Sequence, residues 1–370
     1  MSLFPDAGKA NYDYDYDNDN EIEMKLGIIG PAGAGKTTVF EALSRDFAGG
    51  GAKNENRVGT IHVPDHRIDV LSEMFHPRKT IYAQVEYLLP GKNEGKKETG
   101  ADLAWVQAIR DTDALIVVIR NHSNMGFDAP DPAVDFTGVN QELILTDLAT
   151  VEKRLERLEA DAKRGKAIDR EEQDLLVQSK TALDDEIPLR RIPELARSKQ
   201  LKGYALLSAK PVLVLFNNAD EDESLPPDMA ETGALAGESA MIIRGKLEHE
   251  LAQMPPEEAA ELLAEFNIGA PATDRVIRKS YETMGLLSFF TVGEDEVRAW
   301  TIEKGTSALE AAGKIHTDIQ KGFIRGEIIA YDDLIAAGST AAARKAGTYR
   351  LEGKTYTVKD GDIINFRFNV

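Results

Sequence analysis

Cysteine is absent from this chain of 370 residues. Without thiols the protein can form neither disulfides nor thiolate metal sites, which suits a reducing cytoplasm, the location that we expect. No apolar run approaches the roughly 20 residues that a membrane-spanning helix needs, so we expect no membrane partner. The chain is 42% hydrophobic, which is enough for two or three domains with ordinary apolar cores.

Basic residues are outnumbered, with 44 Lys and Arg against 63 Asp and Glu, and the formal net charge is −19. Such a charge argues against a general nucleic-acid coat unless basic residues gather on one face. Residues 11–23, NYDYDYDNDNEIE, alternate tyrosine with aspartate. Alternation could indicate a strand, but the like charges favour a solvated tail, so we expect residues 1–23 to be acidic and disordered. They also lack the basic start and apolar middle of a signal peptide.

A glycine-rich stretch stands within residues 25–47, KLGIIGPAGAGKTTVFEALSRDF. Residues 30–37 match the pattern G-x-x-x-x-G-K-[ST], and they follow an apolar run and precede a helical pattern, as a phosphate loop requires. A glycine-rich turn without a ligand is the alternative. The residues that we predict to contact a nucleotide here are Gly30, Ala32, Gly33, Ala34, Gly35, Lys36, Thr37 and Thr38.

The residue types explain the chemistry of such a loop. Glycines let successive backbone N–H groups point at phosphate oxygens, and the positive end of the following helix adds to that field. Lys36 would stabilise charge on the terminal phosphates, and the Thr37 hydroxyl would hold Mg²⁺. Thr38 is expected as a phosphate contact. The sequence does not identify a general base.

Apolar runs and helical patterns alternate after the loop. Strands are expected at residues 58–63, 80–89, 114–119 and 211–216, with helices at 67–75, 101–110, 248–263 and 272–284 between and after them. This alternation predicts an α/β fold with a doubly wound, mostly parallel sheet. The strand at 211–216 runs into Asn217, Asn218 and Asp220, which could read a base by accepting hydrogen bonds from ring N–H groups, although Asn and Asp also form turns.

Two segments interrupt or follow this pattern. Apolar residues spaced by three and four predict an antiparallel coiled-coil arm turning near residues 164–169, or else two surface helices on the sheet: Leu148, Val151, Leu155, Leu158, Ala162, Leu175, Leu176 and Leu183. Short strands at 287–291, 298–302, 355–358 and 363–370, with a helix at 307–316, predict a small mixed α/β domain. In it, His316 near Asp318 is interpreted as structural or as part of a contact surface, rather than as a general base.

Several stretches resemble the Obg-like ATPases of the YchF type. SFFTVGEDEVRAWTIEKGTSALEAAGKIHTDIQKGFIRGEIIAYDDL and LEGKTYTVKDGDIINFRFNV are similar to that family's TGS domain, a ubiquitin-like β-grasp fold. QELILTDLATVEKRLERLE resembles its helical arm, and AKPVLVLFNNADED its base-recognition strand. The resemblance implies a P-loop domain at residues 24–138 and 204–285, an inserted arm at 139–203 and a TGS domain at 286–370.

The resemblance also implies a function. Members of this family are cytoplasmic, magnesium-dependent hydrolases that often prefer ATP to GTP, a preference tied to an Asn-x-x-Glu base motif. They contact ribosomes, through RNA or protein, by means of the arm and the TGS domain. In this chain Asn217 and Asp220 are closer to the GTP-reading Asn-Lys-x-Asp than to the family's Asn-x-x-Glu, so both nucleotides stay open. Arg154, Arg157, Lys163, Arg164 and Lys166 of the arm could face RNA or form salt bridges.

Some catalytic features of the family are replaced. Its Asp-Ile-Ala-Gly appears as residues 88–91, LLPG, without the carboxylate that supports magnesium, and its glycine-rich switch is replaced by residues 92–100. Asp65, Glu86, Glu94 or Glu98 are candidates to replace that carboxylate. We therefore predict slow hydrolysis, since such losses lower rate more than affinity. The alternatives are a nucleotide-dependent adaptor without hydrolysis and, less consistent with the accessory domains, a small-molecule kinase.

Overall fold

The computed structural model describes residues 22–45, 55–91, 104–123, 128–227 and 237–369, together with positions 126, 229 and 235. Two compact units divide the chain. The large unit comprises Met24–Thr60 and Glu86–Thr283, and the small unit comprises Ile61–Val85 and Met284–Val370. The expected acidic tail lies outside the described residues, apart from its last two positions, which belong to the first strand. Among the described residues, no helix has the length and apolar character to cross a membrane.

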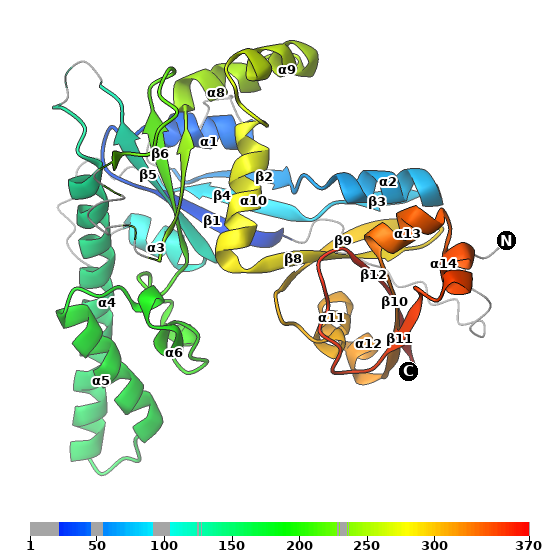
Figure 1. Cartoon of the computed structure of the whole chain (residues 1–370). Coiled ribbons are helices and arrows are strands. Elements are labelled where there is room, and N and C mark those ends of the chain that lie inside the picture. Colours follow the sequence, from blue (N-terminus) through cyan, green and yellow to red (C-terminus); the bar gives the residue numbers. More distant parts are fainter. Residues whose placement is uncertain are drawn as a thin grey trace. The chain divides into compact units, whose positions relative to one another are not determined.

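A six-stranded sheet with the order β2-β4-β1-β5-β6-β7 organises the large unit (Figure 1). Its strands are β1 (Ile22–Ile29), β2 (Arg57–His62), β4 (Gln84–Leu89), β5 (Ala114–Asn121), β6 (Val212–Asn218) and β7 (Ser239–Ile243). β1, β5, β6 and β7 pair in parallel. β6 is buried along its whole length and β5 nearly so, as expected for strands covered on both faces. The predicted mostly parallel, doubly wound sheet is confirmed.

Helices cover this sheet and frame its functional edge. They are α1 (Lys36–Ser44), α3 (Ala104–Arg110), α4 (Pro132–Lys163), α8 (Gly245–Ala252), α9 (Pro256–Glu265) and α10 (Ala272–Met284). α3 and α4 pack on one face of the sheet, where Val106, Ile109 and Phe136 join the apolar core of β1, β5 and β6. The prediction of a single helix at residues 248–263 is wrong. Pro255 and Pro256 divide it into α8 and α9, because a proline within a helix lacks the N–H that the helix requires.

The helical arm is formed by the distal part of α4 and by α5 (Arg170–Asp184), which lie side by side in Figure 1. α4 begins at Pro132 rather than at the expected 139, and Val139 and Leu143 still belong to the core of the sheet. Farther along, Val151 and Leu158 of α4 meet Leu176 and Leu183 of α5. The same cluster includes side chains of three short helices, η2 (Leu189–Arg191), α6 (Pro193–Ala196) and η3 (Lys202–Tyr204).

Three of the five basic residues singled out on the arm have acidic partners. The Arg154 guanidinium binds the Glu172 carboxylate at 2.9 Å, and Lys166 binds Asp161 at 2.8 Å. Arg164 lies 4.0 Å from Asp161. These pairs favour the salt-bridge interpretation for those three residues. We keep contact with RNA as a proposal.

A second six-stranded sheet, with the order β11-β10-β12-β8-β9-β3, organises the small unit. Its strands are β3 (Lys79–Ile81), β8 (Leu286–Val292), β9 (Glu296–Glu303), β10 (Phe323–Ala330), β11 (Arg350–Glu352) and β12 (Asp362–Phe368). Its helices are α2 (His66–Phe75), α11 (Ala308–Ile315), α12 (Thr317–Lys321), α13 (Tyr331–Ala337) and α14 (Thr340–Ala346). β8 and β12 pair in parallel, β8 with β9 and β10 with β12 antiparallel, and α11 packs on the sheet, as in a β-grasp fold.

Residues 61–85 pack with the C-terminal residues of the small unit, unlike the expected assignment of residues 24–138 to one domain. The strand expected at 80–89 is therefore two strands. β3 pairs with β9 of the small-unit sheet, and β4 belongs to the other sheet. From α2, Arg67 binds Asp360 at 2.7 Å and stacks on the Phe290 ring. Contacts between side chains far apart in sequence assign residues 61–85 to the small unit, and a strand pattern in the sequence does not reveal such contacts.

The strand expected at residues 355–358 is also wrong, because the structure gives this stretch a single isolated bridge between Thr357 and Ser307. Its backbone serves a helix instead of a strand. The Tyr356 carbonyl accepts the amide of Ala308, and the Lys354 carbonyl accepts that of Leu309, at the start of α11. His316 is structural as predicted, since its Nδ1 accepts the Asp318 amide at the start of α12.

Candidate nucleotide-binding site

The phosphate loop lies between β1 and α1, at the carboxyl edge of the large-unit sheet. Gly30, Gly33 and Gly35 have φ values of 145°, 77° and 90°, which L side chains rarely adopt. A Cβ atom on Gly30 would also lie 2.2 Å from the carbonyl oxygen of Val118. Glycine is therefore required there twice, for its backbone conformation and for the close approach of β5.

Lys36 spans the loop that precedes it. Its Nζ donates to the carbonyl oxygens of Gly30, at 2.7 Å, and Pro31, at 2.6 Å. The ammonium is thus held beside the backbone that would surround a phosphate. Along the loop, Ala34 is buried whereas Ala32 and Gly33 are exposed, and Thr37 is exposed with Thr38 intermediate on the first turn of α1. A ligand can reach the residues that the sequence singled out for phosphate and metal.

The described residues of the phosphate loop fit a Mg²⁺ ion that binds together with a nucleotide. Within the part of the chain that the structure describes, no group of three acidic or histidine side chains could hold a metal ion. Mg²⁺ is commonly bound by one or two protein oxygens, several waters and phosphate oxygens of the substrate. The exposed Thr37 hydroxyl at the start of α1 fits that donor set.

The side chain of Asn217 connects the phosphate loop to the turn at Gly245. It stands near the end of β6 with 4% of its surface exposed. Its Nδ2 donates to the Ala34 carbonyl, and its Oδ1 accepts the Gly245 amide, each at 3.0 Å. A Cβ on Gly35 would lie 2.3 Å from Asn217 Nδ2, and one on Gly245 would lie 2.7 Å from Oδ1. Two glycines that are 210 positions apart therefore make room for one amide.

Asn218 and Asp220, the other predicted base-contacting residues, have different surroundings. Asn218 is buried, and its Nδ2 donates to the carbonyls of Asp222, at 3.1 Å, and Ser224, at 2.8 Å. Its Oδ1 accepts Asn121 Nδ2 at 2.9 Å. The Asp220 side chain is 32% exposed, with Lys246 Nζ 3.9 Å from its carboxylate. Asn218 thus shapes the loop, whereas the Asp220 carboxylate can meet a ligand.

Two of the candidates to replace the carboxylate missing from residues 88–91, Asp65 and Glu86, are described by the structure, and each has a basic partner. Leu89 is buried, and the Gly91 amide donates to Asn56 Oδ1 at 3.0 Å. Asp65 caps α2 and pairs with Arg67 at 2.8 Å, and Glu86 lies 3.8 Å from Lys25. The candidates Glu94 and Glu98 lie outside the described residues.

Two charged residues near the site did not emerge from the sequence as functional. Glu142 of α4 is one: partial loss of hydration raises the pKa of its carboxyl, and the Lys36 ammonium opposes that rise. The other is Arg244, a buried arginine that precedes Gly245. No local pattern would have revealed Glu142, which stands within the helical repeat of α4.

A phosphate loop on a mostly parallel sheet, joined by a buried asparagine to a base-side turn, defines a P-loop protein of the nucleoside-triphosphatase class. The C-terminal residues 286–369 match the family model YchF-GTPase_C, described as "Protein of unknown function (DUF933)". The chain is 38% identical over 369 residues to the "Ribosome-binding ATPase YchF" of Bacillus subtilis (strain 168), with 93% of this chain and 99% of the relative covered. It belongs to the YchF family of Obg-like ATPases.

Other relatives agree. The "Obg-like ATPase 1" of Oryza sativa subsp. japonica is 34% identical over 372 residues, covering 94% of this chain and 92% of the relative. Among solved structures, the Schizosaccharomyces pombe YchF GTPase superposes with a TM-score of 0.76 and 28% identity, covering 94% of this chain and 98% of that one. A GTP-binding protein from Pyrococcus horikoshii OT3, at 17% identity and a TM-score of 0.59, shows the same fold.

Proposed function

We propose that this protein binds and slowly hydrolyses ATP or GTP, and that the bound nucleotide controls its association with ribosomes. The observation that carries the proposal is the join between the phosphate loop and Asn217, whose amide ties Ala34 to Gly245. This join fixes the distance between the phosphate cradle and the turn beside Asp220, as a ligand with phosphates at one end and a base at the other requires.

Different residues would bind the phosphates, the Mg²⁺ ion and the base of the nucleotide. Backbone amides of residues 30–38 and the positive end of α1 would bind the phosphates, with Lys36 neutralising the charge that develops as the terminal phosphoryl group leaves. Mg²⁺, when bound with the nucleotide, supplies further charge neutralisation, and Thr37 would be its protein ligand. The Asp220 carboxylate would accept N–H groups of the base, an arrangement that suits guanine.

Contact with ribosomes is proposed from the names of the relatives, several of which are called ribosome-binding. The arm and the C-terminal domain are the expected contact regions, and the cytoplasm is the expected location. Co-sedimentation with ribosomal particles at two salt concentrations tests this part. We expect co-migration that weakens at high salt because RNA contacts release counterions. Absence from the pellet at both concentrations would contradict it.

Titration calorimetry of non-hydrolysable ATP and GTP analogues tests the nucleotide site. Lys36→Ala should weaken their affinity by about 30-fold or more, as loss of a desolvated charge partner does. Lys166→Ala removes an exposed arm lysine that pairs with Asp161 and is the matched control, with unchanged affinity expected. Equal binding by the Lys36 variant and the parent would remove the proposed site.

A second candidate function, a nucleotide-dependent adaptor, is favoured by one observation. Leu88, the first residue of LLPG, stands where the family has its metal-supporting aspartate. Incubation of the parent with Mg²⁺ and each triphosphate separates the two functions. Phosphate release that disappears with Lys36→Ala supports the hydrolase, and bound triphosphate that persists intact supports the adaptor.

A further inference from the structure

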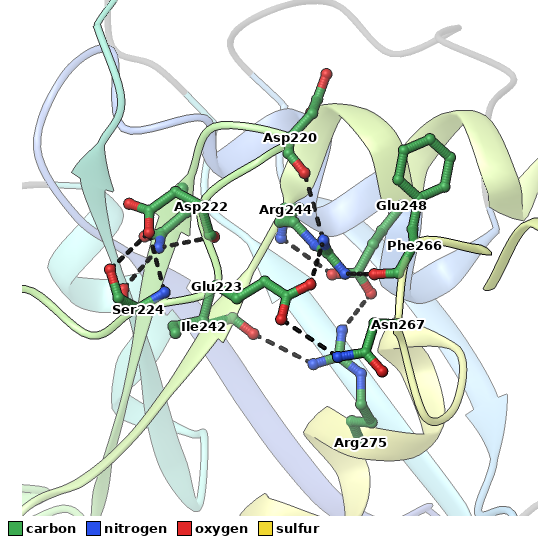
Figure 2. Close-up of polar contacts among 11 residues, drawn as sticks. Asp220, Asp222, Glu223, Ser224, Ile242, Arg244, Glu248, Phe266, Asn267 and Arg275 are labelled. Carbon is green, nitrogen blue, oxygen red and sulfur yellow. Dashed lines mark hydrogen bonds and ion pairs between the residues drawn. The ribbon is translucent and has the colours of Figure 1, made fainter. Parts of the chain in front are cut away.

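Arg244 stands where three segments of the large unit meet (Figure 2). Its guanidinium donates to the Asp220 carbonyl through Nη1, at 3.3 Å, and to the Phe266 carbonyl through Nη2, at 2.8 Å. Nη1 also lies 3.3 Å from the Glu223 carboxylate. The side chain is 8% exposed. One buried cation thus binds both the loop that carries Asp220 and the turn between α9 and α10.

A second layer of contacts holds Arg244 itself. Its backbone amide donates to Glu248 Oε1 at 3.0 Å, and the other oxygen of Glu248 pairs with Arg275 of α10. Arg275 also donates to the Ile242 carbonyl at 3.3 Å. Asn267 Nδ2 lies 3.4 Å from the second oxygen of Glu223. Figure 2 shows these groups as a continuous network around Arg244.

Apolar packing of the α9–α10 turn is limited to a small cluster, in which buried Ile268 meets Leu247 and Leu251 of α8. None of the ten residues of α9, all within the described chain, is buried. A cavity of about 220 Å³ separates α9 from its neighbours, and its lining includes Ala42, Leu251, Ala260 and Ala272. The turn is therefore held by this small cluster together with two polar contacts, from Arg244 to the Phe266 carbonyl and from Arg275 to the Ala270 carbonyl.

We propose that Arg244 is the positioning residue of the base site. It fixes the loop that presents Asp220, and it couples that loop to the α9–α10 turn. A planar guanidinium can bind several acceptors at fixed angles, which an ammonium cannot reproduce. Arg244 touches no expected phosphate contact, so its effect falls on the base and not on the triphosphate. The inference rests on the proposed nucleotide function and names the group that controls its base recognition.

The test compares ligands with and without a base. Dissociation constants of non-hydrolysable GTP and ATP analogues and of inorganic tripolyphosphate, all with Mg²⁺, are measured for the parent, Arg244→Ala and Arg244→Lys. We expect the nucleotide preferred by the parent to bind about tenfold or more weakly in both variants, because buried hydrogen bonds from a charged group are lost. Tripolyphosphate should stay within about twofold, since its contacts are unchanged.

Two controls separate positioning from general stability. Lys166→Ala removes an exposed arm lysine that pairs with Asp161, and it should keep both affinities. Arg190→Ala removes another buried arginine, whose side chain is 6% exposed and pairs with Glu238 at 2.8 Å. That variant should lower the melting temperature without changing the ratio of nucleotide to tripolyphosphate affinity.

The outcomes are distinct. A ratio of nucleotide to tripolyphosphate affinity that is lowered by the Arg244 variants alone supports the inference. An unchanged ratio, a ratio lowered as much by Arg190→Ala, or full nucleotide affinity in Arg244→Lys would overturn it. A parent that binds tripolyphosphate no more weakly than nucleotide also overturns it, while leaving the phosphate site intact. A parent that binds none of the ligands refutes the proposed function itself.

Discussion

The phosphate loop and the base loop lie at the same edge of one sheet, yet they are held in different ways. The phosphate loop depends on its own backbone, through three glycines with positive φ and a lysine that binds carbonyls five and six residues before it. The base loop depends on partners far away in sequence, since Asn121, Arg244 and Phe266 bind it or its supports. A short motif can specify the first loop, whereas the second requires the assembled fold.

Gly30→Ala should have the largest effect, because it breaks the locally determined loop. The residue would have to keep a φ of 145° with its Cβ 2.2 Å from the Val118 carbonyl oxygen. We expect a loss of about 3 kcal/mol or more in the free energy of unfolding and loss of nucleotide binding. Urea denaturation and calorimetric titration measure the two effects.

Gly138→Ala is the matched control for that change. Gly138 lies in α4 with open space where a Cβ would point. Alanine at an exposed helical position should stabilise by about 0.5–1 kcal/mol and leave affinity unchanged. If Gly30→Ala behaved like this control, the loop would not need the backbone conformation that the structure shows.

Asn217→Ala and Asn218→Ala should have intermediate effects on stability, and their effects on ligand binding should distinguish the phosphate loop from the base loop. Asn217→Ala leaves the Ala34 carbonyl and the Gly245 amide without their partner, which should cost about 2–4 kcal/mol in stability. It should also weaken both tripolyphosphate and nucleotide. Asn218→Ala should weaken nucleotide alone, because its partners all belong to the base side. The same binding titrations check both variants, and identical profiles would show that the loops form a single unit.

Asp147→Asn should have the smallest effect on stability at neutral pH. It extends the comparison from the two loops to the base of the arm. Asp147 of α4 accepts the amides of Leu207, at 2.8 Å, and Ser208, at 2.7 Å, just before β6. Burial raises the pKa of its carboxyl from 3.8 to about 6. Between about pH 4 and pH 6 the folded state therefore keeps a proton that the unfolded state releases.

The sign of the resulting pH dependence follows directly. The contribution of Asp147 to stability is largest below pH 4, falls as the pH rises to about 6, and is level above it. The fall amounts to about 3 kcal/mol, since each pKa unit corresponds to about 1.4 kcal/mol. Urea midpoints between pH 4 and pH 7, followed by circular dichroism, should show this slope in the parent. A slope that persists unchanged in Asp147→Asn would assign it to another group.

Much of the fold could be predicted because its signals are local. The apolar runs of β5 and β6 and the helical repeats of α4 and α5 identify themselves over ten to thirty residues. The exceptions are segments whose role depends on distant chain. Residues 79–81 and 84–89 form one strand pattern but belong to two different sheets, and Lys354 and Tyr356 use their carbonyls to support α11. Propensity cannot reveal either choice, because the deciding hydrogen bonds come from elsewhere.

The sequence by itself determined the phosphate loop between β1 and α1, since glycine freedom, the lysine and the helix start are properties of consecutive residues. It also carried the resemblance to the YchF family. Only the tertiary structure decided what surrounds that loop: that Asn217 bridges it to Gly245, that Asn218 serves the protein while Asp220 faces outward, and that Arg244 holds the base loop. The physical reason is that a buried polar side chain binds whichever group the fold brings within about 3 Å, and the sequence does not state which group that will be.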